Sequence, residues 1–175
     1  DRPVSQHLTR DLEHLKREIL TMGGMVEEAL DRSITALMNR DTDLAGEVLQ
    51  GEEAINTKEL EISEEALKVL ALHQPVAVDL RYVIAVIMVN NDLERVGDLA
   101  ENIAERALDM ARLTEEPVPY DLTQMAQTVQ TMVRESLDSL VNQDTPKARK
   151  VCELDDEVDE AHREVYGGKD AESMG

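Results

Sequence analysis

The chain matches itself when it is shifted by 103 residues. At this register the turn Asn39-Arg40-Asp41-Thr42 aligns with Asn142-Gln143-Asp144-Thr145. Self-similarity at a fixed offset predicts two copies of one structural unit in tandem, each beginning with two helices and the same turn. The aligned positions that carry identical residues are Met22/Met125, Ser33/Ser136, Leu37/Leu140, Ala45/Ala148, Val48/Val151 and Glu61/Glu164.

The first unit, residues 1–114, has the apolar periodicity of three helices. Its apolar residues recur at three- and four-residue steps, which is typical of amphipathic helices and predicts helices over 7–39, 43–72 and 76–112. Thr42 is the expected N-cap of the second helix, and Pro75 ends that helix because the residue before proline avoids the α region. Gly23 and Gly24 should weaken or kink the first helix.

A proline-containing linker, residues 115–121, separates the two units. The second unit, residues 122–175, has a predicted helix over 122–141 and another that begins at Pro146, after Thr145 as cap, and fades at Gly167. The counterpart of the first unit's third helix would begin 103 residues beyond Val76, at position 179, and the chain ends at Gly175. We therefore expect an all-α protein of two tandem three-helix bundles, the second one incomplete.

Composition narrows the classes of function. The chain has 18 basic and 38 acidic residues, a formal charge of −20, which argues against binding to nucleic acid or to anionic membrane surfaces. The longest apolar run, Val83 to Val89, is far shorter than the ~20 residues that cross a bilayer. The single cysteine, Cys152, allows no internal disulfide and fits a reducing compartment. We expect a soluble cytoplasmic protein.

Acidic residues in the third predicted helix indicate a metal site. Glu94 and Asp98 are four residues apart, so their carboxylates share one helix face and repel each other by roughly 0.2–0.5 kcal/mol. A bound cation would relieve this repulsion. The second helix offers facing oxygen ligands at Glu52 and Asn56, with Glu53 beside them. The alternative interpretation is a solvated acidic face without a ligand.

The repeat predicts a related set in the second unit, at Asp155 and Asp159. Oxygen ligands suit Mg, Mn, Ca or Fe, in contrast to the thiolate ligands of a typical zinc site. The expected ion is one of Fe, Mn, Mg, Zn or Ca. Asp159-x-x-His162 weakly resembles the Glu-x-x-His element of di-iron bundles, which keeps a ferritin-like metal oxidase open as an alternative. A metal-free helical adaptor is a second alternative. No hydrolase or nucleotide-binding motif is present, so no enzyme activity is expected.

Four further residues of the third helix have an expected role. Asp79 near the helix start is favoured by the helix dipole. Arg81 and Arg95 are candidates either for contact with a partner protein or for ion pairs with the surrounding acids. Gly97 is costly in mid-helix, so we expect a neighbouring helix to approach closely there.

Two longer motifs of the sequence are Gln74-Pro75-Val76-Ala77-Val78-Asp79-Leu80-Arg81 and Leu93-Glu94-Arg95-Val96-Gly97-Asp98-Leu99-Ala100-Glu101-Asn102-Ile103-Ala104. A shorter one, Met22-Gly23-Gly24-Met25-Val26, precedes an acidic amphipathic helix. Together they resemble the PhoU family of phosphate-signalling regulators, and the resemblance covers residues 10 to 166.

This resemblance implies a fold of two three-helix bundles and a cytoplasmic, homodimeric negative regulator of phosphate uptake and phosphate-starvation signalling. It implies contact with the ATPase of the phosphate ABC transporter and with a sensor histidine kinase, whose state populations the regulator would shift. It also implies metal binding through Glu/Asp-x-x-x-Asp motifs. The chain departs from the family in lacking the sixth helix, which carries the second Glu-Arg-x-Gly-Asp stretch.

Overall fold

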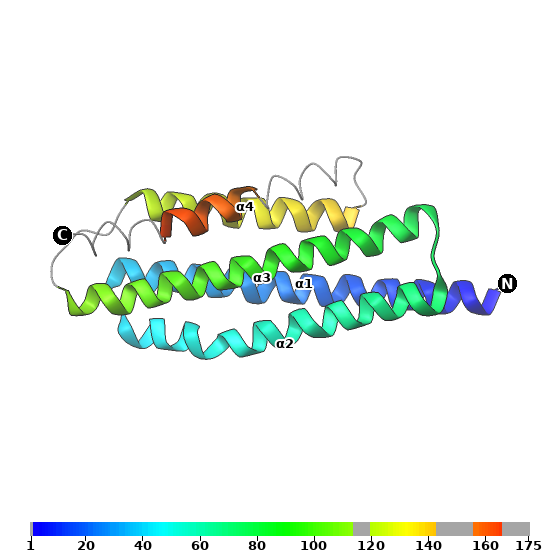
Figure 1. Cartoon of the computed structure of the whole chain (residues 1–175), viewed down its shortest axis with the longest axis horizontal. Helices are drawn as coiled ribbons and strands as arrows, with labels where there is room; N and C mark the ends of the chain where they lie inside the picture. Colours follow the sequence, from blue (N-terminus) through cyan, green and yellow to red (C-terminus); the bar gives the residue numbers. More distant parts are fainter. Residues whose placement is uncertain (1, 114–119, 143–155, 166–175) are drawn as a thin grey trace.

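Long helices make up almost all of the described part of the protein. The computed structural model describes residues 2–113, 120–142 and 156–165. Four helices are α1 (Arg2–Asn39), α2 (Thr42–His73), α3 (Ala77–Arg112) and α4 (Tyr120–Asn142), and residues 156–165 form a further helical segment. Figure 1 shows α1, α2 and α3 running side by side along the length of the molecule. The all-α fold and the three helices of the first unit are confirmed.

The start of α2 differs from the prediction. Its N-cap is Asp41, whose side chain accepts a hydrogen bond of 3.0 Å from the backbone N–H of Leu44. Thr42 was the expected N-cap, but it is the first residue of the helix. The cap is one residue earlier because the Asp41 carboxylate, and not the Thr42 hydroxyl, reaches the free N–H of the first turn.

The turn between α2 and α3 follows the prediction. Gln74 has a left-handed backbone (φ 43°), and its N–H donates to the carbonyl oxygen of Leu70 at 3.2 Å, which closes the last turn of α2 before Pro75. His73, the last residue of α2, lies 2.8 Å from Oδ2 of Asp11 through its Nε2 atom. This contact fixes the end of α2 to the first half of α1.

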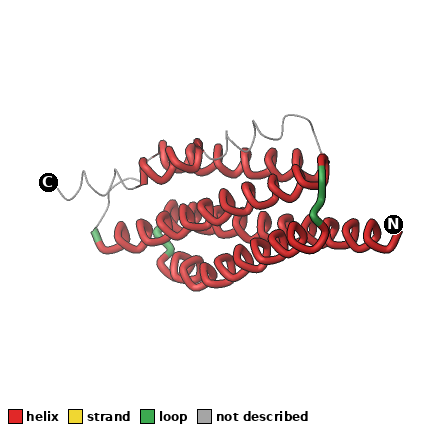
Figure 2. The backbone as a smooth tube through the Cα atoms, turned by 45° about the vertical axis from the view of Figure 1, so that its right-hand side comes forward, coloured by secondary structure: helices red, strands yellow, loops and turns green. Residues whose placement is uncertain are grey.

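The apolar core extends from the α1–α3 bundle to α4 and to residues 156–165. α4 contacts α1 and α3, while among the labelled helices α2 and α4 do not meet. Figure 2 shows the same arrangement from a second direction, with α2 and α4 on opposite sides of α1 and α3. The largest fully buried side chains are Leu15, Ile19, Met22, Leu30, Leu37, Ile62, Leu93, Leu99, Ile103, Leu140 and Val26.

Two glycines mark close packing between helices. A Cβ atom on Gly23 would overlap Cδ1 of Leu137 in α4, and α1 continues as helix through Gly23 and Gly24. A Cβ on Gly97 would lie 3.1 Å from Cγ2 of Ile55 in α2. The expected close approach at Gly97 is confirmed. The weakening or kink expected at Gly23-Gly24 does not end the helix, and Gly23 packs against Leu137 of α4.

Positions that are equivalent in the 103-residue repeat have equivalent surroundings. Ser33 and Ser136 are both buried, as are Leu37 and Leu140. The side-chain N–H of Gln130 also lies 3.5 Å from the carbonyl oxygen of Glu27, its own repeat counterpart. The α1 and α4 helices therefore meet through corresponding faces.

Several predicted features lie outside the described residues. These are the prolines of the linker, Thr145 with Pro146, Cys152, Asp155 and the tail from Gly167. The helices in the described part of the chain do not combine the length and the apolar character that crossing a bilayer requires.

Candidate metal centre

Three carboxylates from two helices converge on the surface between α2 and α3. Glu52 of α2 meets Asp98 and Glu101 of α3, with one carboxylate oxygen of each within 4.8 Å of the others. We call these three residues the carboxylate cluster. The helices come close enough because the small Gly97, next to Asp98, accepts Ile55, which lies one turn after Glu52.

The surroundings of the cluster disfavour a full set of negative charges. A hydrogen bond with Glu52, together with burial, raises the pKa of Glu101 to about 8. Burial and the nearby Asp98 raise the pKa of Glu94 to about 7, and Glu94 hydrogen-bonds Asp98. These carboxyls hold protons near neutral pH because like charges lie close together in a half-buried site. A cation would take the place of those protons.

Asp98 lies at the centre of the charges. Burial and the nearby Glu52 raise its pKa, while its hydrogen bond with Glu94 and the neighbouring His162 and Arg95 side chains act in the opposite direction. Arg95 is on the same helix and His162 belongs to the segment 156–165. The second unit therefore supplies part of the electrostatic environment of a cluster built on the first.

The predicted site residues fall into two groups. The structure brings Glu52 and Asp98 together and places Glu94 beside them, but Glu53 is exposed and is not part of the cluster. Asn56 is likewise exposed. Glu101 was missed by the sequence analysis, although its three-residue spacing from Asp98 puts both on one helix face.

Asp159 and His162 are engaged in holding the segment 156–165 on α3. Asp159 forms an ion pair with Arg95, and Nε2 of His162 lies 2.8 Å from the backbone oxygen of Arg95. The other ring nitrogen of His162 lies 3.3 Å from Nδ2 of Asn102. Both nitrogens of His162 therefore have protein partners, which does not favour the di-iron interpretation of Asp159-x-x-His162.

Of the two arginines left open by the sequence, Arg95 is involved in ion pairs. It pairs with Asp159 and lies 3.9 Å from Asp92, one turn earlier on α3. Arg81 is exposed near the start of α3. The ion-pair interpretation therefore applies to Arg95, and Arg81 stays a candidate for partner contact.

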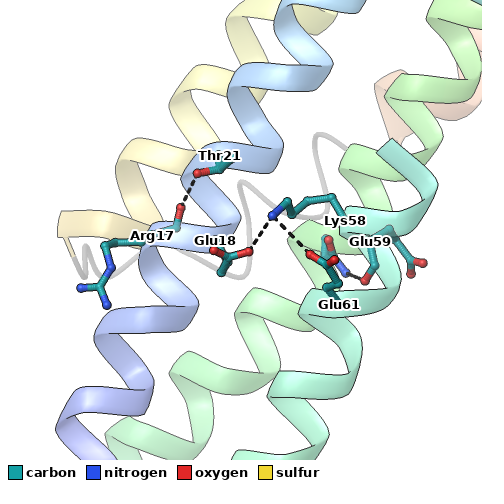
Figure 3. Close-up of polar contacts among 7 residues, drawn as sticks. Arg17, Glu18, Thr21, Lys58, Glu59 and Glu61 are labelled. Atoms are coloured by element: carbon teal, nitrogen blue, oxygen red, sulfur yellow. Dashed lines mark hydrogen bonds and ion pairs between the residues drawn. The ribbon is translucent and has the colours of Figure 1, made fainter. Parts of the chain in front are cut away.

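A second group of charges lies on the seam between α1 and α2. Figure 3 shows Lys58 of α2 between Glu18 of α1 and Glu61 of its own helix, at 2.9 Å and 3.3 Å. The bond to Glu18 raises the pKa of Lys58. Lys58 therefore joins α2 to α1 through Glu18 and offsets part of the negative charge of the two acids.

Asp79 lies in the first turn of α3, as expected for an acid favoured by the helix dipole. It lines a cavity of about 210 Å³ together with Tyr82 of the same helix, Val141 of α4 and residues of α1 that include Glu13. Burial, with a contribution from Glu13, raises the pKa of Tyr82 to about 12. The Tyr82 hydroxyl is therefore neutral at physiological pH.

Comparison with known proteins gives the family. The PhoU domain matches residues 19–107 and 122–168. The chain belongs to the PhoU family. Its match with the PhoU homolog of Aquifex aeolicus is 40% identical over 161 residues, covering 90% of this chain and 72% of that protein. With PhoU of Escherichia coli K12 it is 32% identical over 162 residues, covering 93% and 67%. Both relatives are phosphate-specific transport system accessory proteins.

Solved PhoU structures have the same fold. The crystal structure of PhoU from Pseudomonas aeruginosa matches with a TM-score of 0.76 at 34% identity, covering 95% of this chain and 80% of that one. The phosphate transport system regulatory protein PhoU from Streptococcus pneumoniae matches with a TM-score of 0.74 at 26% identity, covering 90% and 74%. The family resemblance that the two motifs indicated is confirmed.

Proposed function

We propose that this chain restrains phosphate uptake and the phosphate-starvation response by contact with other proteins, and that it does so without catalysis. The observation that carries this proposal is the PhoU match along most of the chain, since relatives at 32–40% identity are accessory proteins of phosphate-specific transport. The long, continuous helices supply extended surfaces for such contact.

The partners proposed are those that the family resemblance implies: the ATPase of the phosphate ABC transporter and the cytoplasmic part of a sensor histidine kinase. A regulator of this kind acts by binding one state of its partner more tightly than another. The cytoplasm as its location and a homodimer as its assembly are parts of the same proposal, and sedimentation equilibrium measures the assembly.

We also propose that the carboxylate cluster binds a hard cation such as Mg²⁺, Mn²⁺, Ca²⁺ or an iron ion. Glu52, Asp98 and Glu101 would supply oxygen ligands from two helices, with Glu94 adjacent. The raised pKa values of Glu94 and Glu101 support this, because they reflect a concentration of negative charge that a cation neutralises. A cation there would tie α2 to α3.

The experiment that tests the proposed function is direct binding to the two partners. The purified chain is titrated, by isothermal titration calorimetry, with the transporter ATPase and with the kinase's cytoplasmic part, both from the genome that encodes the chain. We expect saturable one-to-one binding to at least one of them in the micromolar range or tighter, about −8 kcal/mol. An absence of binding to both, by a folded chain with and without added Mn²⁺, would overturn the proposal.

A further inference from the structure

Large apolar side chains that reach solvent are concentrated at one end of the α2–α3 hairpin. Of the eleven that are exposed in the described part of the chain, seven lie between residues 66 and 90. We call residues 66–90 the apolar end of the hairpin; Figure 1 shows the turn of this hairpin at one end of the molecule. Val76 is 76% exposed, Leu72 70% and Leu67 61%.

The exposed residues of α3 form a continuous stripe. Leu80, Ile84 and Met88 are four residues apart, and 36%, 44% and 43% of each is exposed. Residues at this spacing lie one above the other on a helix surface. Leu80 and Val76 also belong to the Gln74–Arg81 motif on which the family resemblance rests, and burial does not account for either.

The α2 helix contributes exposed apolar residues at the same height as those of α3. Nδ2 of Asn90 donates to the carbonyl oxygen of Glu59 at 3.0 Å and to Oγ of Ser63 at 3.1 Å, which sets the register of the two antiparallel helices. Leu67 lies four residues after Ser63 and Ile84 six residues before Asn90. At 1.5 Å per residue these distances are about 6 Å and 9 Å, so Leu67 and Ile84 are at nearly the same height.

The apolar end also differs from its surroundings in charge. Residues 66–90 contain two basic residues, Lys68 and Arg81, and one acid, Asp79. The preceding 25 residues of the chain, 41–65, contain nine acids and one lysine, and residues 91–112 contain six acids and three arginines. An exposed apolar surface depleted of charge has the composition of the buried centre of a protein interface.

The turn at the apolar end is held in an unfavourable backbone conformation. Gln74 and Ala77 both have positive φ angles, of 43° and 51°, without being glycine. Each such residue costs about 1 kcal/mol or more and persists where the surrounding structure imposes it. Val76 lies between these two residues and is exposed at the turn.

We propose that the apolar end of the α2–α3 hairpin is a docking surface for a different protein, whose contact area is apolar and bordered by lysine and arginine. We infer a basic border on the partner because acidic residues of this chain flank the surface on both α2 and α3. A second copy of this chain fits less well at this surface, since the acids that flank the surface on one copy would meet the same acids on the other. This inference rests on the proposed function, regulation by protein contact, and names the surface that makes it.

The test uses the transporter ATPase and the kinase's cytoplasmic part as probes. Leu67→Glu with Ile84→Glu places two charges on the apolar end at positions that are already exposed. The matched control, Leu20→Glu with Met38→Glu, adds the same charges at exposed apolar positions of α1. We expect the first pair to weaken binding at least tenfold and the control pair less than twofold, with both variants equally helical. Binding should also weaken as NaCl is raised from 50 to 500 mM, because salt screens the attraction between the acids of this chain and the basic border of the partner.

Each other result overturns the proposal in a distinguishable way. If the unaltered chain binds neither probe, the proposed function is overturned and this surface with it. If the chain binds and L67E/I84E binds equally well, or salt has no effect, only the docking surface or its basic complement is wrong. A chain dimer that L67E/I84E alone dissociates would assign the surface to a second copy. Binding to phosphatidylglycerol vesicles that L67E/I84E abolishes, without an effect on either probe, would assign it to lipid.

Discussion

Glu52 and Glu53 are neighbours on α2 with the same chemistry, but only Glu52 belongs to the carboxylate cluster. We predict that Glu52→Gln weakens Mn²⁺ binding by about tenfold or more, since the loss of even an outer partner of a metal site costs 10–100-fold. Glu53→Gln removes the same charge one residue away and should leave the affinity within twofold. Isothermal titration of the chelator-treated chain measures both. Equal losses in the two variants would mean that the acidic surface attracts cations without a defined site.

The same cluster predicts a pH dependence for the metal-free chain. The native pKa values of Glu94 and Glu101, about 7 and about 8, lie above the ordinary value of 4.5. Between about pH 4.5 and pH 8 the native state therefore binds more protons than the unfolded state. The free energy of unfolding falls as the pH rises through this range. In the presence of a chelator, the Tm of the chain should be higher at pH 5.5 than at pH 8.5.

Substitution of both residues isolates this effect from the rest of the acidic chain. Glu94→Gln with Glu101→Gln removes the two titrating groups, so Tm should decline less steeply with pH than in the unaltered chain. Thermal unfolding followed by circular dichroism at 222 nm provides the comparison. Identical slopes would show that these two carboxyls do not carry the dependence.

Gly23 and Gly24 give a paired test of packing. Gly24 has open space around it, so Gly24→Ala should stabilise the chain by about 0.5–1 kcal/mol through helix propensity. Gly23→Ala should lose that gain or destabilise, because its Cβ must displace Leu137. Denaturant unfolding of the two variants measures the difference, and an equal gain in both would show that α4 does not pack tightly there.

The sequence was sufficient to find part of the cluster and not the rest. The four-residue spacing of Glu94 and Asp98 identified the correct face of α3. Which acid of α2 faces that site depends on the phase of the helix, which packing fixes: Ile55 is buried, and Glu52, one turn earlier, shares its side. Glu53 lies 100° further round.

At the scale of helices, apolar periodicity predicted the elements well because it reflects burial directly. The last residue of α3 agrees with the prediction, and α2 ends within one residue of its predicted end. The N-cap was less predictable, since Asp41 and Thr42 are both good capping residues and only the geometry of the turn distinguishes them. The start of α1 at Arg2 extends beyond the predicted residue 7.

The contacts that hold segment 156–165 on α3 give a prediction at this scale. Asp159→Asn removes the ion pair with Arg95 and should speed amide exchange across residues 156–165 by up to about fivefold, since a partly exposed pair is worth about 0–1 kcal/mol. Glu160→Gln, an exposed neighbour, should leave exchange unchanged. Hydrogen exchange by mass spectrometry measures both, and equal rates in the two variants would contradict a holding role for Asp159.

At the scale of the whole molecule, the repeat indicated duplication but not how the two units meet. That arrangement depends on side-chain fit, such as Leu137 against Gly23, and on polar contacts such as Gln130 with Glu27. The result places His162, a residue of the second unit, next to a cluster carried by the first. The same two helices, α2 and α3, present the carboxylate cluster in one half and the apolar end in the other.

We propose that this molecule restrains the response to phosphate starvation. The most direct test uses a reporter gene that phosphate starvation induces. The host is a bacterial strain from which its own PhoU has been removed, so the reporter is active even in phosphate-rich medium. Our account predicts that expression of this chain returns the reporter to its repressed level in rich medium while leaving induction on starvation intact. A reporter that stays fully active in rich medium, with the chain folded and abundant in the cells, would contradict it.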